Sequence, residues 1–162
     1  MTGDRSDLTI IQHQALESFR RGDIDRDTII AQLWPVEGPH SADISTEATS
    51  AIEHLLRYAN HATRNAPAAA MPSPEDAAKA VRRLGGALAK LPQLCSQLAA
   101  QTDRFAADPA LRANSAADQE PGVQAGLAAE ALRELAAAAA PLHHLTNAAA
   151  IPLDNLWLDE PT

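Results

Sequence analysis

Histidine is the side chain best suited to metal binding or proton transfer near neutral pH, and six histidines are spread along this chain. His54 and His61 are seven residues apart and share one face of a predicted helix. Carboxylate-bridged helical bundles carry a Glu-x-x-His spacing on two helices. The only such spacing here, Glu37 to His40, lies in a loop containing Gly and Pro. We therefore expect histidines in contact with solvent, no metal site and no cofactor, and keep a ligand- or metal-binding bundle as an alternative.

Cys95 is the only cysteine, so the chain has no internal disulfide. It falls on the apolar side of a predicted helix, where a thiol usually behaves as a small apolar group. A catalytic thiol needs exposure and a neighbouring base. The sequence contains no P-loop, no Gly-x-Gly-x-x-Gly and no Gly-x-Ser-x-Gly. These observations give no catalytic residues, and we expect that the protein is not an enzyme.

A third group that could have a binding role is the set of arginines near the first turn: Arg20, Arg21 and Arg26. Residues 8–34 read as two short helices around that turn, which is the outline of a DNA-binding helix-turn-helix. Three aspartates alternate with the arginines, however, and the whole chain carries a formal charge of −8, which repels phosphate. A helical hairpin that covers one end of a bundle is the favoured interpretation. A DNA-binding transcriptional regulator using residues 8–34 is kept as an alternative.

The composition indicates that helices must position all of these residues. Apolar residues make up 46% of the chain, mostly Ala and Leu, and only 3% of residues are aromatic. Ala and Leu head the helix-propensity scale, and no segment alternates like a strand. The sequence predicts an all-α fold in one domain over 1–162. The expected bundle is built on a long antiparallel hairpin of helices at about 74–105 and 122–150, with a third helix at about 46–65 and the short pair within 8–34.

Start and stop signals place these helices. Asp7 is the expected cap of the first helix and Gly22 its end; Asp23 or Asp25 caps the second. Ser45 or Thr46 is the expected start of the third, and residues 66–74 read as a linker. Ser73-Pro74-Glu75-Asp76 is the strongest start signal, with a hydroxyl cap, Pro at the first position and two acids in the first turn.

Apolar residues recur every 3.5 positions in both long helices, which is the period of coiled-coil packing. The expected contact positions are Ala77, Val81, Leu84, Leu88, Leu91, Cys95 and Leu98 on one helix, and Ala128, Ala131, Leu135, Ala138, Leu142, Leu145 and Ala149 on the other. We expect Leu88 and Leu135 to be core residues. Pro92 and Pro141 remove backbone donors, so each should kink its helix.

The C-terminal tail, 151–162, differs in kind because it is acidic and rich in large apolar groups. Leu153, Leu156, Trp157 and Leu158 lie within six residues. Trp is among the residues most enriched at binding hot spots. We expect these four residues to dock on their own bundle or on a partner, and they are the predicted partner-binding residues.

Taken together, these patterns favour a non-enzymatic protein–protein interaction module, a small helical adaptor or regulator that binds a protein partner or itself as a dimer. The bias of 11 Arg to 2 Lys and the abundant Ala are typical of a bacterial genome rich in G and C. The N-terminus lacks a signal-peptide pattern and no apolar run is long enough to span a membrane. We therefore expect a cytoplasmic protein with no membrane or nucleic-acid partner.

Overall fold

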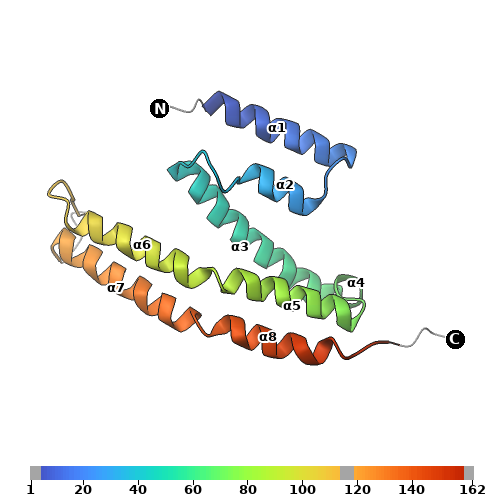
Figure 1. Cartoon of the computed structure of the whole chain (residues 1–162). Helices are drawn as coiled ribbons and strands as arrows, with labels where there is room; N and C mark the ends of the chain where they lie inside the picture. Colours follow the sequence, from blue (N-terminus) through green and yellow to red (C-terminus); the bar gives the residue numbers. More distant parts are fainter. Residues whose placement is uncertain (1–4, 114–118, 159–162) are drawn as a thin grey trace. The chain divides into compact units, whose positions relative to one another are not determined.

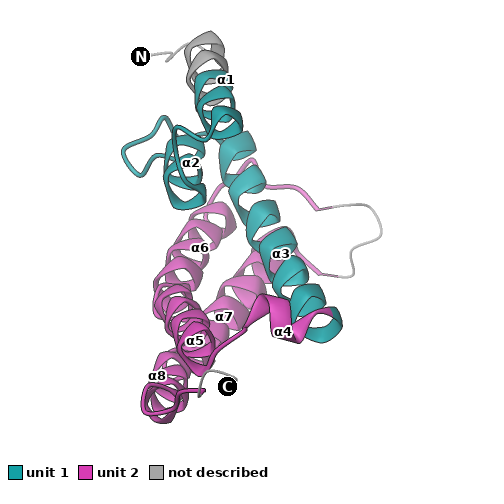
Figure 2. Cartoon of the chain, turned by 90° about the vertical axis from the view of Figure 1, so that its right-hand side faces the viewer, with its two compact units in different colours: residues 1–65 teal, residues 66–162 magenta. Residues whose placement is uncertain are grey.

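The computed structural model describes residues 5–113 and 119–158, and all its regular elements in these ranges are helices. The predicted all-α fold is therefore confirmed. The helices group into two compact units, residues 1–65 and 66–162 (Figure 2). Each unit is described by itself below, and the expectation of a single domain stays a prediction.

The first unit begins with the predicted pair of short helices, α1 (Arg5–Arg21) and α2 (Arg26–Leu33), which pack on each other (Figure 1). Gly22 ends α1 with a φ of +79°, a conformation that costs glycine little. Asp25 caps α2, because its carboxylate accepts a 2.7 Å hydrogen bond from the backbone N–H of Thr28. The expectation that Asp7 caps α1 is wrong, since α1 begins at Arg5.

Helix α3 (Ala42–Asn65) is the predicted third helix, but it starts earlier than expected. The hydroxyl of Ser41 accepts a 3.2 Å hydrogen bond from the N–H of Ile44 and so caps the helix. Neither Ser45 nor Thr46 is the cap; the Thr46 hydroxyl instead donates to the carbonyl of Ala42 at 2.8 Å. No residue of α3 is buried, and Leu55 on its apolar face is 53% exposed.

The second unit is the predicted long hairpin (Figure 1). Its first arm comprises α5 (Pro74–Leu88) and α6 (Leu91–Ala106), and its second arm comprises α7 (Pro121–Ala139) and α8 (Leu142–Leu153). Helix α6 packs on α7, and α5 packs on α8, so the arms are antiparallel as predicted. A short helix, α4 (Pro67–Ala70), occupies the segment that we expected to be an irregular linker.

Each arm is interrupted once, near the proline that predicts a kink. The first break falls at 89–90, just before Pro92, and the second at 140–141. A proline lacks the N–H that would bond to the carbonyl four residues earlier, and its ring clashes with that carbonyl. The two breaks lie side by side. Gly85 lies against Thr146, and in antiparallel arms equal steps away from such a pair reach the same level. Lys90 is five residues after Gly85, and Pro141 is five residues before Thr146. The two arms are therefore interrupted at the same level.

The contact between the arms has the predicted period but a different phase. Its buried side chains are small: Ala78, Cys95, Ala99, Ala129, Ala136, Ala139 and Ala150, together with the buried Gly85. Residues on the same rows are half-buried: Val81, Leu88, Pro92, Leu132, His143 and Thr146. We call these fourteen positions the seam. Along each arm they are spaced alternately three and four residues apart.

Much of the predicted contact set is therefore wrong by one residue. On the first arm only Val81, Leu88 and Cys95 belong to the seam, while Leu84 and Leu98 are exposed. On the second arm every predicted position directly precedes a seam residue, and Leu135 is 49% exposed rather than a core residue. The physical reason is the short distance between the arms. A Cβ built on Gly85 would lie 3.2 Å from the Cβ of Thr146, and one on Gly122 would lie 3.1 Å from the carbonyl oxygen of Ala106. The fully buried positions of such a contact therefore take small side chains, and the larger seam residues are only half-buried.

Candidate functional site

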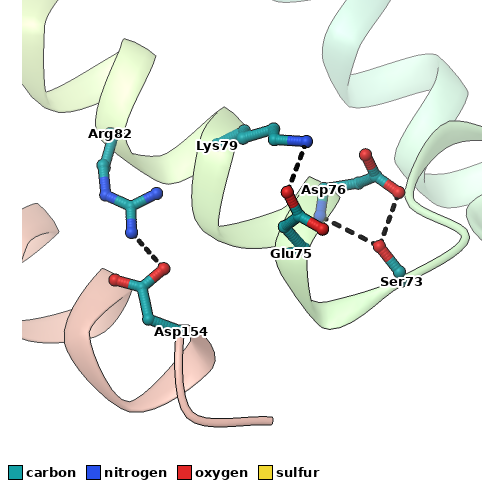
Figure 3. A network of polar contacts seen from close by, with 6 residues as sticks. All are labelled: Ser73, Glu75, Asp76, Lys79, Arg82 and Asp154. Carbon is teal, nitrogen blue, oxygen red and sulfur yellow. Dashed lines mark hydrogen bonds and ion pairs between the residues drawn. The ribbon is translucent and has the colours of Figure 1, made fainter. Parts of the chain in front are cut away.

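The two edges of the hairpin carry opposite kinds of side chain. On one edge, Arg82 forms an ion pair with Asp154 (Figure 3), and Arg133 forms one with Asp103. Arg82 and Arg133 directly follow the seam residues Val81 and Leu132. Asp103 and Asp154 directly follow Thr102 and Leu153, which continue the seam spacing by one step beyond its last residue on each arm. Both pairs join the first arm to the second. Residues that follow the seam therefore lie on a common edge of the hairpin.

Helix geometry then places the residues that directly precede seam positions on the opposite edge. On the first arm the large apolar residues among them are Leu84, Leu91, Leu94 and Leu98, and Phe105 lies seven residues after Leu98. On the second arm the large apolar residues among them are Leu135, Leu142 and Leu145. We call these eight residues the leucine face. Both arms contribute to it, so it forms one broad surface along the hairpin.

The leucine face is substantially open to solvent. Leu98 is 47% exposed, Phe105 49% and Leu145 65%, whereas Leu91 and Leu142 are half-buried. Scattered exposed leucines are ordinary, whereas large contiguous exposed apolar patches are a common mark of interaction sites. Six of these residues were predicted to lie in the contact between the arms, whereas Leu94 and Phe105 were not among the predicted contact positions. The seven-residue spacing from Leu84 to Phe105 was the available signal for a second apolar row.

The charged residues that flank the leucine face differ in sign between the two arms. On the outer side of the first arm lie Arg83, Lys90 and Arg104, each two residues after a position of the seam row, and at the matching place on the second arm lies Glu134. All four are exposed. The first arm therefore presents a basic border and the second an acidic one. Such borders give electrostatic complementarity to a bound surface more than they give raw affinity.

The start of α5 is held by local polar contacts (Figure 3). The Ser73 hydroxyl accepts a 3.1 Å hydrogen bond from the backbone N–H of Asp76 and donates a 2.6 Å bond to the carboxylate of Asp76. Lys79 pairs with Glu75 at 2.8 Å, and this hydrogen bond raises the pKa of Lys79. These contacts stabilise the first turn of the helix. They confirm Ser73 as its cap and place no reactive group there.

The histidines and the cysteine are not brought together into a reactive cluster. His54 and His61 are exposed on α3, and the rings of His143 and His144 lie close together in α8, with centroids 3.7 Å apart and planes tilted by 41°. His143 Nδ1 lies 2.9 Å from the carbonyl oxygen of Ala140. Cys95 is buried in the seam, as expected. Among residues 5–113 and 119–158, no three His, Cys, Asp or Glu side chains are grouped so as to hold a metal ion.

An acidic neighbour engages one of the arginines around the first turn. The Arg21 guanidinium donates to the carboxylate of Asp23 at 2.8 Å. The hydrogen bonds that Thr28 donates hold the pKa of Asp25 below its ordinary value. The pair between Arg21 and Asp23 offsets part of the positive charge at the α1–α2 turn. DNA binding through residues 8–34 was the alternative prediction, and it stays a prediction.

The predicted partner-binding residues of the tail are found at the end of the second unit. Leu153 is the last residue of α8 and is half-buried. Leu156, Trp157 and Leu158 follow it in irregular structure and are exposed, Trp157 by 79%. Residues 159–162, the end of the acidic tail, lie outside the described range. Contact of this segment with a partner stays a prediction.

No protein-family model, curated protein or solved structure matches the chain. In the ranges that the structure describes, none of the helices combines the length and the apolar character needed to cross a bilayer.

Proposed function

We propose that this chain is a non-enzymatic protein–protein interaction module, a small cytoplasmic helical adaptor or regulator, and that the leucine face is its binding surface. The observation that supports the proposal is the open apolar row from Leu84 to Phe105, continued by Leu135, Leu142 and Leu145 on the second arm. Aromatic and aliphatic side chains with a charged border are the usual anatomy of an interface.

The size of this surface suits specific binding. Burying a large apolar side chain completely contributes roughly 1.5–3 kcal/mol. If eight such side chains each gain about half of that, the total is roughly 6–12 kcal/mol. Association costs an estimated 4–15 kcal/mol in lost freedom of motion. The two magnitudes are comparable, so the leucine face supports specific association when its polar border also fits the partner.

Capture from the source-cell lysate with the tagged full-length chain tests the proposal. Leu98→Glu places a carboxylate in the middle of the leucine face. Ser96→Glu adds the same charge on the same helix, at an exposed position away from that face. We expect Leu98→Glu to remove the proteins that the wild type retains, and Ser96→Glu to keep them. Circular dichroism establishes that both variants remain helical. Equal retention by all three chains would overturn the leucine face as the binding surface.

The tail is tested separately as a second contact. A chain ending at Asn155 removes Leu156, Trp157 and Leu158 but keeps α8 and the ion pair between Asp154 and Arg82. If the tail contributes to binding, this chain retains less partner than the full length while Leu153 and the leucine face are unchanged.

A further inference from the structure

We propose that the leucine face binds a second copy of this chain, giving a two-fold symmetric four-helix bundle. In this dimer α5–α6 of each copy lies across α7–α8 of the other copy. The proposal rests on the proposed function, because it uses the same surface and names the partner. It is carried by two properties of the face, the sign of charge along its borders and the sizes of its side chains.

Charge distinguishes the two ways in which identical hairpins can meet face to face. In one, the first arm lies on the first arm of the other copy, and Arg83, Lys90 and Arg104 face their own equivalents across the border. In the other, the first arm lies on the second arm, and the basic border meets the acidic border. Like charges across an interface are unfavourable and opposite charges favourable. The second arrangement is therefore selected.

The register of the hairpin specifies which charges meet. Gly85 is level with Thr146, and Ala106 is level with Gly122. The two-fold axis of the selected arrangement is parallel to the helices, so equivalent residues of the two copies lie at the same height along that axis. Glu134 of the second copy then lies along α6 between Lys90 and Arg104, within one or two turns of Lys90.

Side-chain size fits the same arrangement. With the register just given, Leu98 is level with Ala131 of the second copy, and Leu91 is level with Ala138. On the opposite side of the bundle, Leu142 of the second copy is level with Ala87. Layers that set a large residue against a small one interdigitate well. The alanine rows beside the leucines, which are exposed in the single chain, thus receive the leucines of the other copy.

Sedimentation equilibrium of the full-length chain tests the proposal. The wild type is expected to be dimeric. Leu98→Glu is expected to raise the dimer dissociation constant by at least about a hundredfold, because each dimer loses two leucine contacts. Ser96→Glu is expected to leave the constant within about threefold. A monomeric wild type at all accessible concentrations would overturn the proposal.

A charge exchange tests the arrangement itself. Lys90→Glu with Arg104→Glu reverses the charge of two of the three basic-border residues, and Glu134→Lys reverses the charge of the acidic border. Each variant alone is expected to self-associate roughly tenfold more weakly than the wild type. An equimolar mixture of the two is expected to form a heterodimer, because both borders of that pair join opposite charges, whereas both borders of either homodimer join like charges. No preference for the heterodimer would overturn the proposed arrangement.

The two experiments separate failure of this proposal from failure of the proposed function. If the wild type is monomeric but Leu98→Glu still removes captured proteins that Ser96→Glu keeps, the leucine face binds a different protein. In that case the dimer is wrong and the interaction module stands. If the wild type is monomeric and the capture is unaffected by Leu98→Glu, both proposals fail.

Discussion

Two adjacent glycines in α5 give the sharpest test of the close contact between the arms. Gly85 is buried, and an added Cβ would lie 3.2 Å from the Cβ of Thr146 with the Thr146 hydroxyl nearer still. Gly86 is exposed, and an added Cβ would meet nothing within 4 Å. The substitution of either residue by Ala removes the same flexibility from the same helix. The two variants therefore differ only in what the new methyl group contacts.

The expected free energies follow from these surroundings. Ala is favoured over Gly inside a helix by about 1 kcal/mol, so Gly86→Ala should stabilise the protein by roughly 0.5–1 kcal/mol. Gly85→Ala gains the same amount but overpacks the seam, which costs about 1–3 kcal/mol. Thr146 cannot rotate away freely, because its hydroxyl donates a 2.8 Å hydrogen bond to the carbonyl of His143. Gly85→Ala should thus be less stable than Gly86→Ala by roughly 1–3 kcal/mol.

Urea unfolding followed by circular dichroism measures this difference, and hydrogen exchange of α5 and α8 amides assigns it to the correct helices. Thr146→Ala provides the coupling test, since it removes the hydroxyl that the new methyl group meets. The cost of Gly85→Ala should be smaller in the Thr146→Ala background than in the wild type. If Gly85→Ala stabilised the protein as much as Gly86→Ala, the arms would be farther apart than the structure has them, and the reasoning would be refuted.

Two further predictions concern the seam and the first turn. Ala136→Leu should destabilise the chain by about 1–3 kcal/mol through overpacking. Leu135→Ala should change the stability of the monomer by less than about 0.5 kcal/mol, because Leu135 lies outside the seam. If urea unfolding gave the reverse order, Leu135 and not Ala136 would lie in the contact between the arms, as the sequence predicted. Asp25 has a lowered pKa in the folded chain, so its stabilising contact is complete above the ordinary Asp pKa and is lost as the pH falls through the folded value. An NMR titration of the Asp25 carboxyl and the Thr28 amide measures this, and titration at or above the ordinary pKa of Asp would contradict it.

The sequence predicted the helices well because their signals are local. Ser73 and Asp25 are polar caps, Gly22 is a stop signal, and Pro121 sits at the first position of α7. Each needs only its immediate neighbours to act. The errors at the starts of α1 and α3 have the same origin, since Ser41 is a cap of the same kind as Ser45 and lies only four residues before it.

The phase of the seam could not be predicted in the same way, because it depends on the distance between two helices. Ranking residues by hydrophobicity places Leu135 at the contact, whereas the close approach at Gly85 and Gly122 requires Ala136 there. Both choices repeat every 3.5 residues, so the period alone does not distinguish them. The same one-residue shift moved the large side chains from the predicted core to the surface and so created the leucine face.

The breaks at 89–90 and 140–141 have a consequence for the kinetics of folding. Because they are level, they divide the hairpin into two helix pairs that share no continuous helix: α6 with α7 beside the loop, and α5 with α8 at the open end. Closing a short loop loses less entropy than closing a long one. The pair beside the loop, α6 with α7, is therefore expected to form first, and the pair at the open end, α5 with α8, is expected to form after it. Each pair would then exchange its amide hydrogens as a separate cooperative unit, with the pair at the open end opening more often than the pair beside the loop.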